Sequence, residues 1–197
     1  MRFAAAPIGD LRFRAPGEPP HVEGIQKADQ RNCNVDTVSR ARSKLPVWFF
    51  IQGGGYAANS NDNFDATEVI LQSGKNIVSV QINYRVGPFG FLASDKVQRD
   101  GDLNVGLLDQ EKALEWDQKY IHLFGGGPDH VVIHGVSAGA GSVAYHLTAH
   151  GGKGKSRFVG AIAESPFWPT HRTVADSEFQ FAELVSAVDC TDSHDTM

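Results

Sequence analysis

The sequence predicts an α/β fold with a central, mostly parallel sheet and helices on both faces. Short, fully apolar segments alternate with segments of helical periodicity along most of the 197 residues. Strands that are apolar on both sides are typical of parallel sheets whose two faces are covered by helices. No internal repeat or low-complexity linker interrupts this alternation, so the prediction is a single domain over residues 1–197.

The first predicted elements are two strands and the helix between them. The run LPVWFFIQ, residues 45–52, is short, apolar and rich in aromatic residues, which indicates a buried strand. In DATEVILQSG, residues 65–74, Asp65 is expected to cap a short helix that stops at the final glycine. The second strand is NIVSVQINY, residues 76–84, and the turn residues of RVGPFG end it.

Residues 104–124 predict a long amphipathic helix. Apolar residues recur there at intervals of three and four, with charged residues between them. We expect the apolar set to face the core and the charged set to face solvent. The apolar set is Ala113, Trp116, Tyr120 and Leu123, and the charged set is Glu111, Lys112, Asp117 and Lys119.

Two further strands follow, each with a helix after it. GGGPDH breaks the long helix, and VVIH, residues 131–134, is the third predicted strand. FVGAIAE, residues 158–164, is the fourth. Ala140, Val143, Ala144 and Leu147 place one helix behind Ser137, and Phe181, Leu184, Val185 and Val188 predict the last helix.

Composition excludes several classes of function. The chain has 41% hydrophobic and 21% charged residues and a net charge of −5, without a basic cluster. This argues against nucleic acid or an anionic membrane as the main partner. No apolar run is long enough for a membrane span or a signal peptide. The eight histidines show no metal-ligand spacing, so neither a metal nor a cofactor is expected, and the oligomeric state is left open.

The pattern Gly-x-Ser-x-Gly at residues 135–139 marks the candidate active site. A chain of this composition contains the pattern by chance only about 0.15 times, and here it follows a predicted strand and precedes a predicted helix. That is the context of a nucleophile elbow, a sharp turn that presents a serine. Ser137 is therefore the predicted nucleophile, and the N–H of Ala138 lies at the positive end of the next helix, where it can stabilise an oxyanion.

A glycine triplet ends the first predicted strand. Gly53, Gly54 and Gly55 can turn backbone N–H groups toward a ligand, as the glycine-rich loops of esterases do for a tetrahedral intermediate. Alone, such a triplet is more typical of a structural loop. Together with the downstream elbow it favours an oxyanion hole.

A dinucleotide-binding site is the main alternative for the same region. GAGSVA, residues 139–144, matches the relaxed G-x-G-x-x-G/A fingerprint, and Glu164 follows 20 residues later. In the register set by the strand end, however, Ser137 occupies the middle glycine position and would block the pyrophosphate. The glycine triplet has no role in that scheme, so the esterase hypothesis is favoured.

Five segments together resemble the type-B carboxylesterase/lipase family, the cholinesterase-like branch of the α/β-hydrolases, and are most similar to its fungal members. The resemblance extends from Met1 to Cys190 in family order. The segments are RFAAAPIGDLRFRAP, KLPVWFFIQGGGYA, NIVSVQINYRVGPFGFLAS, GDLNVGLLDQEKALEWDQKYIHLFGG and HVVIHGVSAGAGSVAYHLTA.

The resemblance implies an α/β-hydrolase fold and hydrolysis of a small carboxylic ester through an acyl-enzyme. Ser137 would be the nucleophile, with the N–H groups of Gly54, Gly55 and Ala138 as the oxyanion hole. It further implies a secreted protein, although the opening residues show no signal peptide. Phe167 and Trp168 are expected either to line an acyl pocket or to pack in the core.

Several departures from the family pattern accompany the resemblance. The family's catalytic acid and histidine follow later strands, and only one predicted strand follows Ser137. Glu164, Asp176, His171 and His194 match no family triad motif. The chain is therefore expected to be the N-terminal portion of a hydrolase domain, truncated at both ends, with no catalytic acid or histidine of its own and little turnover by itself.

Smaller departures concern structural pairs. Arg85 has the character of a charge-paired structural residue, but Gly127 replaces a family aspartate, which predicts that Arg85 has lost a partner. Cys33 and Cys190 resemble family disulfide cysteines, and their state is left open. A non-catalytic binding or adhesion-type member of the family is the remaining alternative.

Overall fold

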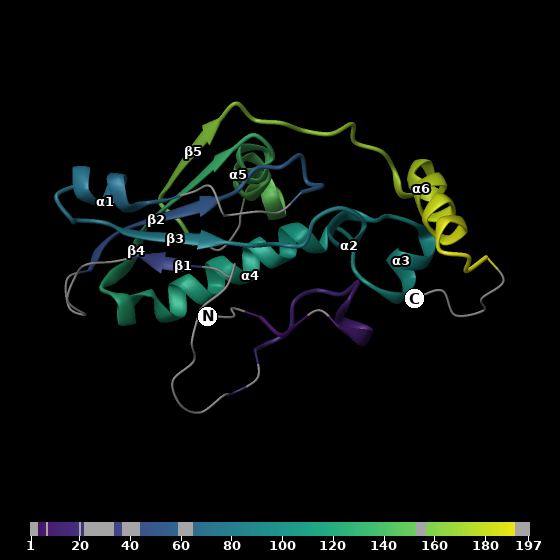
Figure 1. Ribbon diagram of the computed structural model, residues 1–197, viewed down its shortest axis with the longest axis horizontal. Helices are drawn as coiled ribbons and strands as arrows, with labels where there is room; N and C mark the ends of the chain where they lie inside the picture. The colour runs from purple at the N-terminus through teal and green to yellow at the C-terminus, as the bar shows by residue number, and fades with distance from the viewer. Residues whose placement is uncertain are drawn as a thin grey trace.

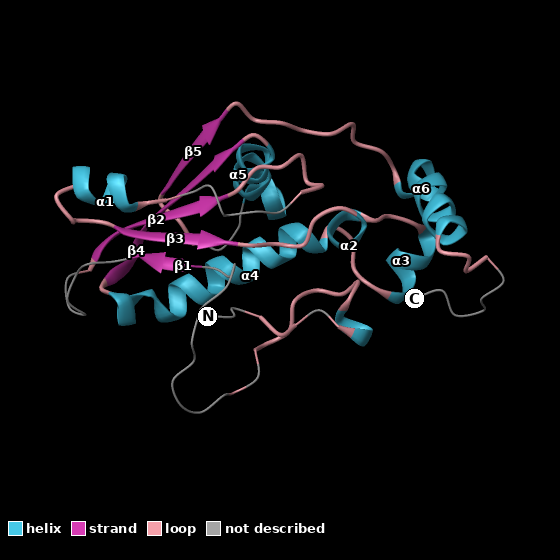
Figure 2. Cartoon of the chain, in the orientation of Figure 1, coloured by secondary structure: helices cyan, strands magenta, loops and turns pink. Residues whose placement is uncertain are grey.

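The computed structural model describes residues 4–6, 8–19, 21, 34–36, 44–58, 65–152 and 157–191. Within them, five strands form one sheet in the order β1-β3-β2-β4-β5 (Figures 1 and 2). The last four strands of the chain pair in parallel, and β1 pairs antiparallel with β3. The strands are β1 Asn34–Asp36, β2 Leu45–Ile51, β3 Val78–Ile82, β4 Gly126–Val136 and β5 Gly160–Glu164.

Helices connect and flank these strands, which confirms the predicted α/β fold. The predicted helices are present as α1, α4, α5 and α6, and none of the described helices is long and apolar enough to cross a membrane. The α-helices are α1 Thr67–Gln72, α2 Pro88–Phe91, α3 Asp95–Asp100, α4 Val105–Tyr120, α5 Ala138–Thr148 and α6 Val174–Ala187. Short 3₁₀ turns are η1 Gly9–Leu11, η2 Ile121–Phe124 and η3 Ala149–Gly152.

The main hydrophobic core lies between one face of the sheet and the helices α4 and α5. Because side chains alternate along a strand, Val47, Phe49 and Ile51 of β2 share one face, and all three are buried. They pack in one cluster with Leu114 of α4 and Val143 of α5. Burying each side chain of this kind stabilises the fold by about 1.5–3 kcal/mol, so this face anchors β2 and the loop that follows it.

The opposite face of the sheet carries an aromatic cluster. Trp48 stacks on His134 with ring centroids 5.5 Å apart, and its indole N–H donates to His134 Nδ1 at 2.9 Å. Phe50 meets the same imidazole edge-on at 5.4 Å. The bond from Trp48 leaves the proton of a neutral imidazole on Nε2, which lies 3.3 Å from a carboxylate oxygen of Glu164. His134 is therefore bonded to neighbouring side chains on this face of the sheet.

The long helix α4 has nearly the predicted bounds but buries a different face. Asp117, expected toward solvent, is fully buried, whereas Leu123, expected in the core, follows the helix in η2 and is 60% exposed. The buried stripe is Gly106, Asp109, Gln110, Ala113, Leu114 and Asp117. The hydrophobic pattern was wrong here because two of the polar residues have partners inside the protein: Arg85 bonds to Asp109, and Ser142 bonds to Gln110.

Some elements were missed or misplaced at the sequence level. The three-residue strand β1 and the short helices α2 and α3 were not predicted, and β4 begins at Gly126, five residues before the predicted strand. Asp65 does not occupy the N-cap position of α1, which belongs to Ala66. Asp65 Oδ1 instead accepts from the Thr67 amide at 2.9 Å, and this bond with Thr67 lowers the pKa of the carboxyl.

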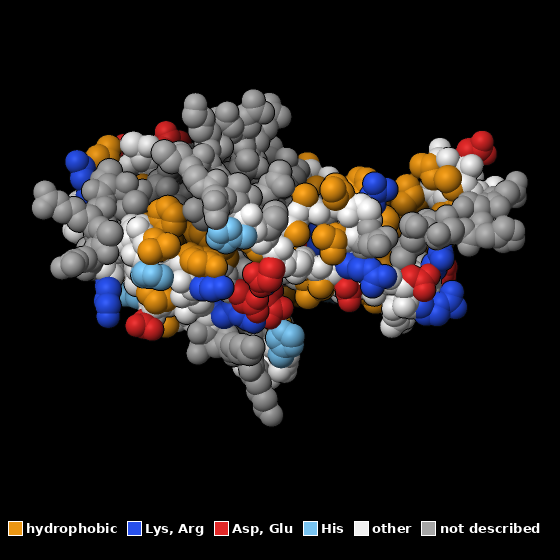
Figure 3. All heavy atoms as spheres, turned by 90° about the horizontal axis from the view of Figure 1, so that it is seen from below, with side chains coloured by type: hydrophobic (Ala, Val, Ile, Leu, Met, Phe, Trp, Pro, Cys, Tyr) orange, Lys and Arg blue, Asp and Glu red, His pale blue; other side chains and the backbone are white. Residues whose placement is uncertain are grey.

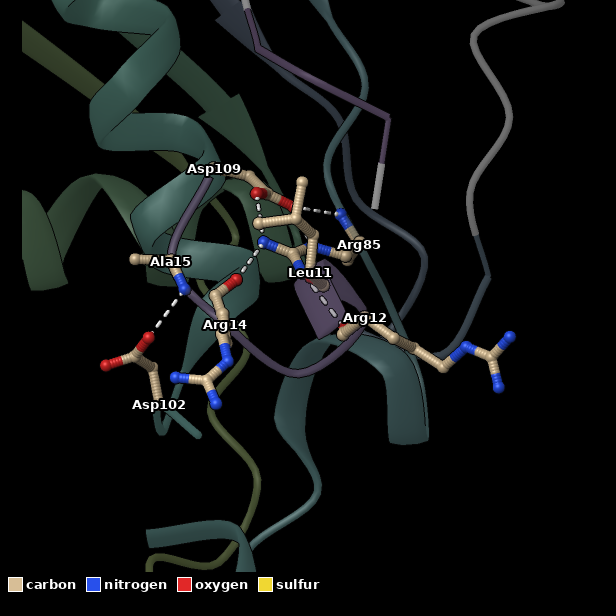
Figure 4. A network of polar contacts seen from close by, with 7 residues as sticks. All are labelled: Leu11, Arg12, Arg14, Ala15, Arg85, Asp102 and Asp109. Carbon is tan, nitrogen blue, oxygen red and sulfur yellow. Dashed lines mark hydrogen bonds and ion pairs between the residues drawn. The ribbon is translucent and has the colours of Figure 1, made fainter. Parts of the chain in front are cut away.

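Arg85 joins the N-terminal segment to the body of the protein (Figure 4). Its guanidinium donates to both carboxylate oxygens of Asp109, at 2.8 and 2.7 Å. It also donates to the carbonyl oxygens of Leu11 and Arg12 at 3.0 Å and of Arg14 at 2.9 Å. The prediction that Arg85 has lost a partner is therefore wrong, because its acid lies on α4 and not at position 127.

The solvent-exposed side of α4 carries a cluster of ion pairs. Arg157 contacts Glu111 at 2.6 Å and Glu115 at 2.8 Å, and Lys112 pairs with Glu18. Figure 3 shows acidic and basic side chains gathered on the side of the molecule seen from below. These side chains range from partly buried to exposed, and the exposed pairs among them contribute about 0–1 kcal/mol each.

Helix α6 lies away from the sheet, next to α3 (Figure 1). The backbone amide of Asp95, at the start of α3, donates to the carboxylate of Glu178 on α6. The predicted apolar face of α6 is only half-buried at Phe181, Leu184 and Val185. Among the described helices and strands, α3 is the element that α6 contacts through this bond.

Candidate active site

Ser137 lies in the sharp turn between β4 and α5. Its backbone has φ 57° and ψ −121°, a conformation that non-glycine residues seldom adopt and that costs about 1–3 kcal/mol. Hydrogen bonds hold the turn from both sides: the Ser137 amide donates to the Glu164 carbonyl, and the Ser137 carbonyl accepts from Gly141 and Phe167, all at 3.0 Å. Strain of this kind, imposed by the surrounding structure, is typical of functional residues.

The two glycines of the motif allow three elements to meet at this turn. A Cβ atom at position 135 would lie 2.2 Å from the carbonyl of Gly139. A Cβ atom at position 139 would lie 2.0 Å from the Ile51 carbonyl oxygen at the end of β2. Larger residues would separate α5 from the sheet, so the two glycines allow the close packing of this helix.

The glycine triplet lies directly beside Ser137. A Cβ atom on Gly53 would lie 2.8 Å from the Val136 carbonyl oxygen and 3.1 Å from Ser137 Cβ. Gly54 and Gly55 follow with φ 110° and 63°, and the Gly54 carbonyl closes the turn by accepting from the amides of Ala57 and Ala58. Both glycines are exposed, whereas Ala138 is fully buried at the first position of α5.

The structure thus places the start of the glycine triplet, Gly53, beside the turn that carries Ser137, and Ala138 begins the helix after that turn. This follows from topology, because β2 and β4 are parallel neighbours and their carboxyl ends lie at the same edge of the sheet. The loops after them carry the triplet and the elbow. That the N–H groups of Gly54, Gly55 and Ala138 stabilise an oxyanion stays a prediction.

The histidines and acids near this edge have other partners. Glu164 contacts His134, and His171 Nε2 lies 2.5 Å from the Tyr145 hydroxyl. Across the described ranges, no histidine is hydrogen-bonded to Ser137. His194 lies outside the described residues, so the expectation that the acid and the histidine lie elsewhere stays a prediction.

A buried polar chain beneath the glycine loop was missed at the sequence level. Ser142 and Gln110 are fully buried and bond to each other at 3.1 Å. Ser142 reaches the Tyr56 hydroxyl at 3.5 Å, and Gln110 Oε1 lies 2.9 Å from His146 Nε2. The only local signal is that Tyr56 directly follows the triplet.

Burial fixes the protonation of this chain. It raises the pKa of Tyr56 to about 12 and lowers the pKa of His146 to about 4. Tyr56 therefore stays a neutral phenol and His146 a neutral imidazole near pH 7. The Tyr84 hydroxyl, whose pKa burial also raises, donates to the Gln52 carbonyl at 2.9 Å and fixes the backbone just before the triplet.

The remaining predicted candidates are two aromatic residues after β5 and two cysteines. Phe167 and Trp168 are partly exposed, and the Phe167 ring lies 6.4 Å from that of Tyr56, so a role in an acyl pocket stays a prediction. Cys190 carries a free thiol, and Cys33 lies outside the described residues. The described residues contain no group of three or more side chains that could hold a metal ion.

The chain is similar in sequence and structure to fungal lipases and esterases. Residues 32–197 match the model of the carboxylesterase family. Lipase 2 of Geotrichum candidum is 39% identical over 79% of this chain and 30% of its own length, and a secreted triacylglycerol lipase of Gibberella zeae is 38% identical over 85% and 31%. The crystal structure of Aspergillus niger EstA superposes with a TM-score of 0.95 at 54% identity, over 99% of this chain and 42% of EstA.

The chain covers only part of the length of each of these relatives. The chain spans about a third of the length of each of the two fungal lipases and less than half of EstA. The likeness covers β2, the glycine triplet, the elbow and the strands between them. Because the family model matches residues 32–197 and EstA is 54% identical over nearly the whole chain, the chain belongs to the carboxylesterase family.

Proposed function

We propose that this chain supplies the nucleophile and the oxyanion hole of a carboxylic ester hydrolase. The observation that carries the proposal is the strained turn that presents Ser137 beside Gly53, at the start of α5. A serine held in this way, with glycine amides and a helix N-terminus beside it, is suited to acyl transfer.

The reaction needs these groups and a histidine from outside residues 1–197. Ser137 Oγ attacks the ester carbonyl while a histidine takes its proton, and the carbonyl oxygen becomes an oxyanion that the N–H groups of Gly54, Gly55 and Ala138 stabilise. The C–O bond to the alcohol then breaks, and the alcohol leaves with the proton from the histidine. Water then attacks the acyl-enzyme carbonyl while the histidine takes its proton. The bond to Ser137 Oγ breaks, the serine regains the proton from the histidine, and the carboxylic acid leaves.

The substrate class and the location are inferred from the relatives. Their names include lipase, carboxylesterase and secreted triacylglycerol lipase, and we infer a carboxylic ester as substrate and an extracellular protein. Phe167 and Trp168 are candidates for contact with the acyl group, because Phe167 is bonded to the Ser137 backbone and Trp168 is partly exposed.

We further propose that the acid and the histidine of the triad lie outside residues 1–197, in a domain of which this chain is the N-terminal portion. Without an imidazole, the serine hydroxyl stays protonated and oxyanion stabilisation alone supports only a small part of catalysis. Reading the transcript beyond the codon for Met197 tests this: an in-frame glutamate or aspartate and a histidine at family spacing are expected.

Covalent labelling tests the nucleophile. A fluorophosphonate probe should label the full-length gene product, and Ser137→Ala should abolish both labelling and hydrolysis of p-nitrophenyl butyrate. Ser165→Ala, at the exposed serine after β5, is the matched control and should label normally. Labelling that survives Ser137→Ala, or a full-length protein that is not labelled at all, would contradict the proposal and favour a non-catalytic member of the family.

A further inference from the structure

Tyr56 connects the glycine loop to the helix that follows Ser137. Its backbone is fixed at φ 60°, and its carbonyl accepts from the Gly87 amide at 2.6 Å. The buried ring packs edge-on against Phe91 at 5.0 Å. A Cβ atom at position 141 of α5 would lie 2.6 Å from the Tyr56 hydroxyl oxygen, so the phenol rests directly on the first turn of α5.

The polar chain behind Tyr56 runs in one direction. Gln110 Nε2 donates to Ser142 Oγ at 3.1 Å, which leaves the Ser142 hydroxyl hydrogen for Tyr56 at 3.5 Å. At the other end, Gln110 Oε1 is an acceptor, so His146 must donate to it from Nε2. His146 is neutral near pH 7 and Gln110 is fully buried, so the chain leads from His146 through Gln110 and Ser142 to Tyr56.

This chain links the three elements that form the candidate active site. Gln110 belongs to α4 and Ser142 to α5, and Tyr56 is the residue that ends the Gly53–Gly55 turn. Ser142 lies five residues beyond Ser137 on the same short helix. The contact between Ser142 and Tyr56 therefore connects the residue after the glycine turn to the helix that follows the nucleophile.

We propose that Tyr56, Ser142 and Gln110 are positioning residues of the oxyanion hole, acting through the glycine loop and not on the substrate itself. The proposal rests on the proposed function of Ser137. Its reasoning is geometric: amides that stabilise an oxyanion must meet a developing charge at hydrogen-bond distance, and a displacement of about 1 Å costs up to about a hundredfold in rate.

The test removes single hydroxyl groups from the full-length gene product. Tyr56→Phe and Ser142→Ala leave the ring and the helix in place. We expect each to lower kcat for p-nitrophenyl butyrate by roughly tenfold with KM within about twofold, because only the transition state needs the loop amides. A trifluoromethyl ketone, whose adduct with Ser137 carries an oxyanion, should bind more weakly by the same factor.

Tyr145→Phe is the matched control. Tyr145 lies on the same helix, but its hydroxyl bonds to exposed His171 and takes no part in the chain. Rates are normalised by active-site titration, so that loss of folded protein does not lower them. Because the two hydroxyls act as one unit, the double variant Tyr56→Phe with Ser142→Ala should be no slower than Ser142→Ala alone.

The outcomes separate the two proposals. If wild-type protein shows no Ser137-dependent labelling, the proposed function fails before any of these variants is made, and the positioning role fails with it. If labelling depends on Ser137 but Tyr56→Phe and Ser142→Ala keep the kcat and inhibitor affinity of Tyr145→Phe, the positioning role alone is wrong. A lower melting temperature with unchanged kcat per active site would also overturn it.

Discussion

Asp117 is a carboxyl group buried on α4 without a hydrogen-bond partner among the described residues. Burial raises its pKa from 3.8 to about 7, since an ionised carboxylate loses its hydration there. Between these two pH values the unfolded chain ionises while the folded protein keeps the proton. The free energy of unfolding should therefore fall as the pH rises from about 4 to about 7.

Asp117→Asn tests this expectation. The amide has the same shape and no charge, and each pH unit in that window contributes about 1.4 kcal/mol. The variant should therefore gain stability over wild type between pH 4 and pH 8, by a total of roughly 4 kcal/mol in urea unfolding. Asp129→Asn, at an exposed position, is the control and should follow wild type. A stability difference between Asp117→Asn and wild type that does not change with pH would show that the carboxyl is hydrated or paired.

The residues around Ser137 were predictable because their restrictions are local. A serine in a strained turn needs small neighbours at fixed offsets, and Gly135 and Gly139 supply them. Tyr56 and Gln110 could not be predicted in the same way, since their roles depend on where α4 lies against α5. No spacing in the sequence encodes that contact.

Among the secondary-structure elements, the bounds of α4 could be predicted from the sequence, but its buried face could not. Helix length follows from local pattern, but a polar residue can be buried once a distant residue satisfies it. Asp109 is such a residue, because Arg85 reaches it from a point 24 residues earlier. The short elements β1, α2 and α3 were missed for a related reason, since three to six residues give too little periodicity and tertiary contacts define them.

The Arg85 contacts predict how the N-terminal segment is held. Arg85→Lys keeps the charge but loses the fork that binds Asp109 and three carbonyl groups at once. Weakening this largely buried pair should lower the free energy of unfolding by roughly 3 kcal/mol. Limited proteolysis within residues 8–19 should be faster than in wild type.

Lys96→Ala is the comparison for that experiment. It removes an exposed helical ion pair with Asp100, at 3.0 Å, and should change stability by no more than about 0.5 kcal/mol. Equal proteolysis of Arg85→Lys and wild type would show that other contacts hold the segment.

On the scale of the whole molecule, β5 is an edge strand of the described sheet with exposed apolar side chains. Ile162 of β5 is 47% exposed, and Val159, just before the strand, is 65% exposed. An uncovered strand edge invites pairing with another chain. We expect residues 1–197, produced alone, to associate as concentration rises in light scattering after size exclusion.

Ile162→Lys should reduce this association, since charges on an edge strand oppose pairing. Leu71→Lys, at an equally exposed apolar residue of α1, removes similar apolar surface without touching the strand edge. If both variants reduce association to the same extent, general hydrophobic contact and not strand pairing drives it.

The strand order also determines when β2 can pair with its neighbours during synthesis. β2 is the middle strand, but its neighbour β4 pairs Val131 with Val47, 84 residues further along the chain. At about 5–20 residues per second, a ribosome needs roughly 4–17 s to cover that interval. Throughout it, one side of the apolar strand LPVWFFI lacks its neighbour β4, so we expect nascent β2 to be a binding segment for a chaperone.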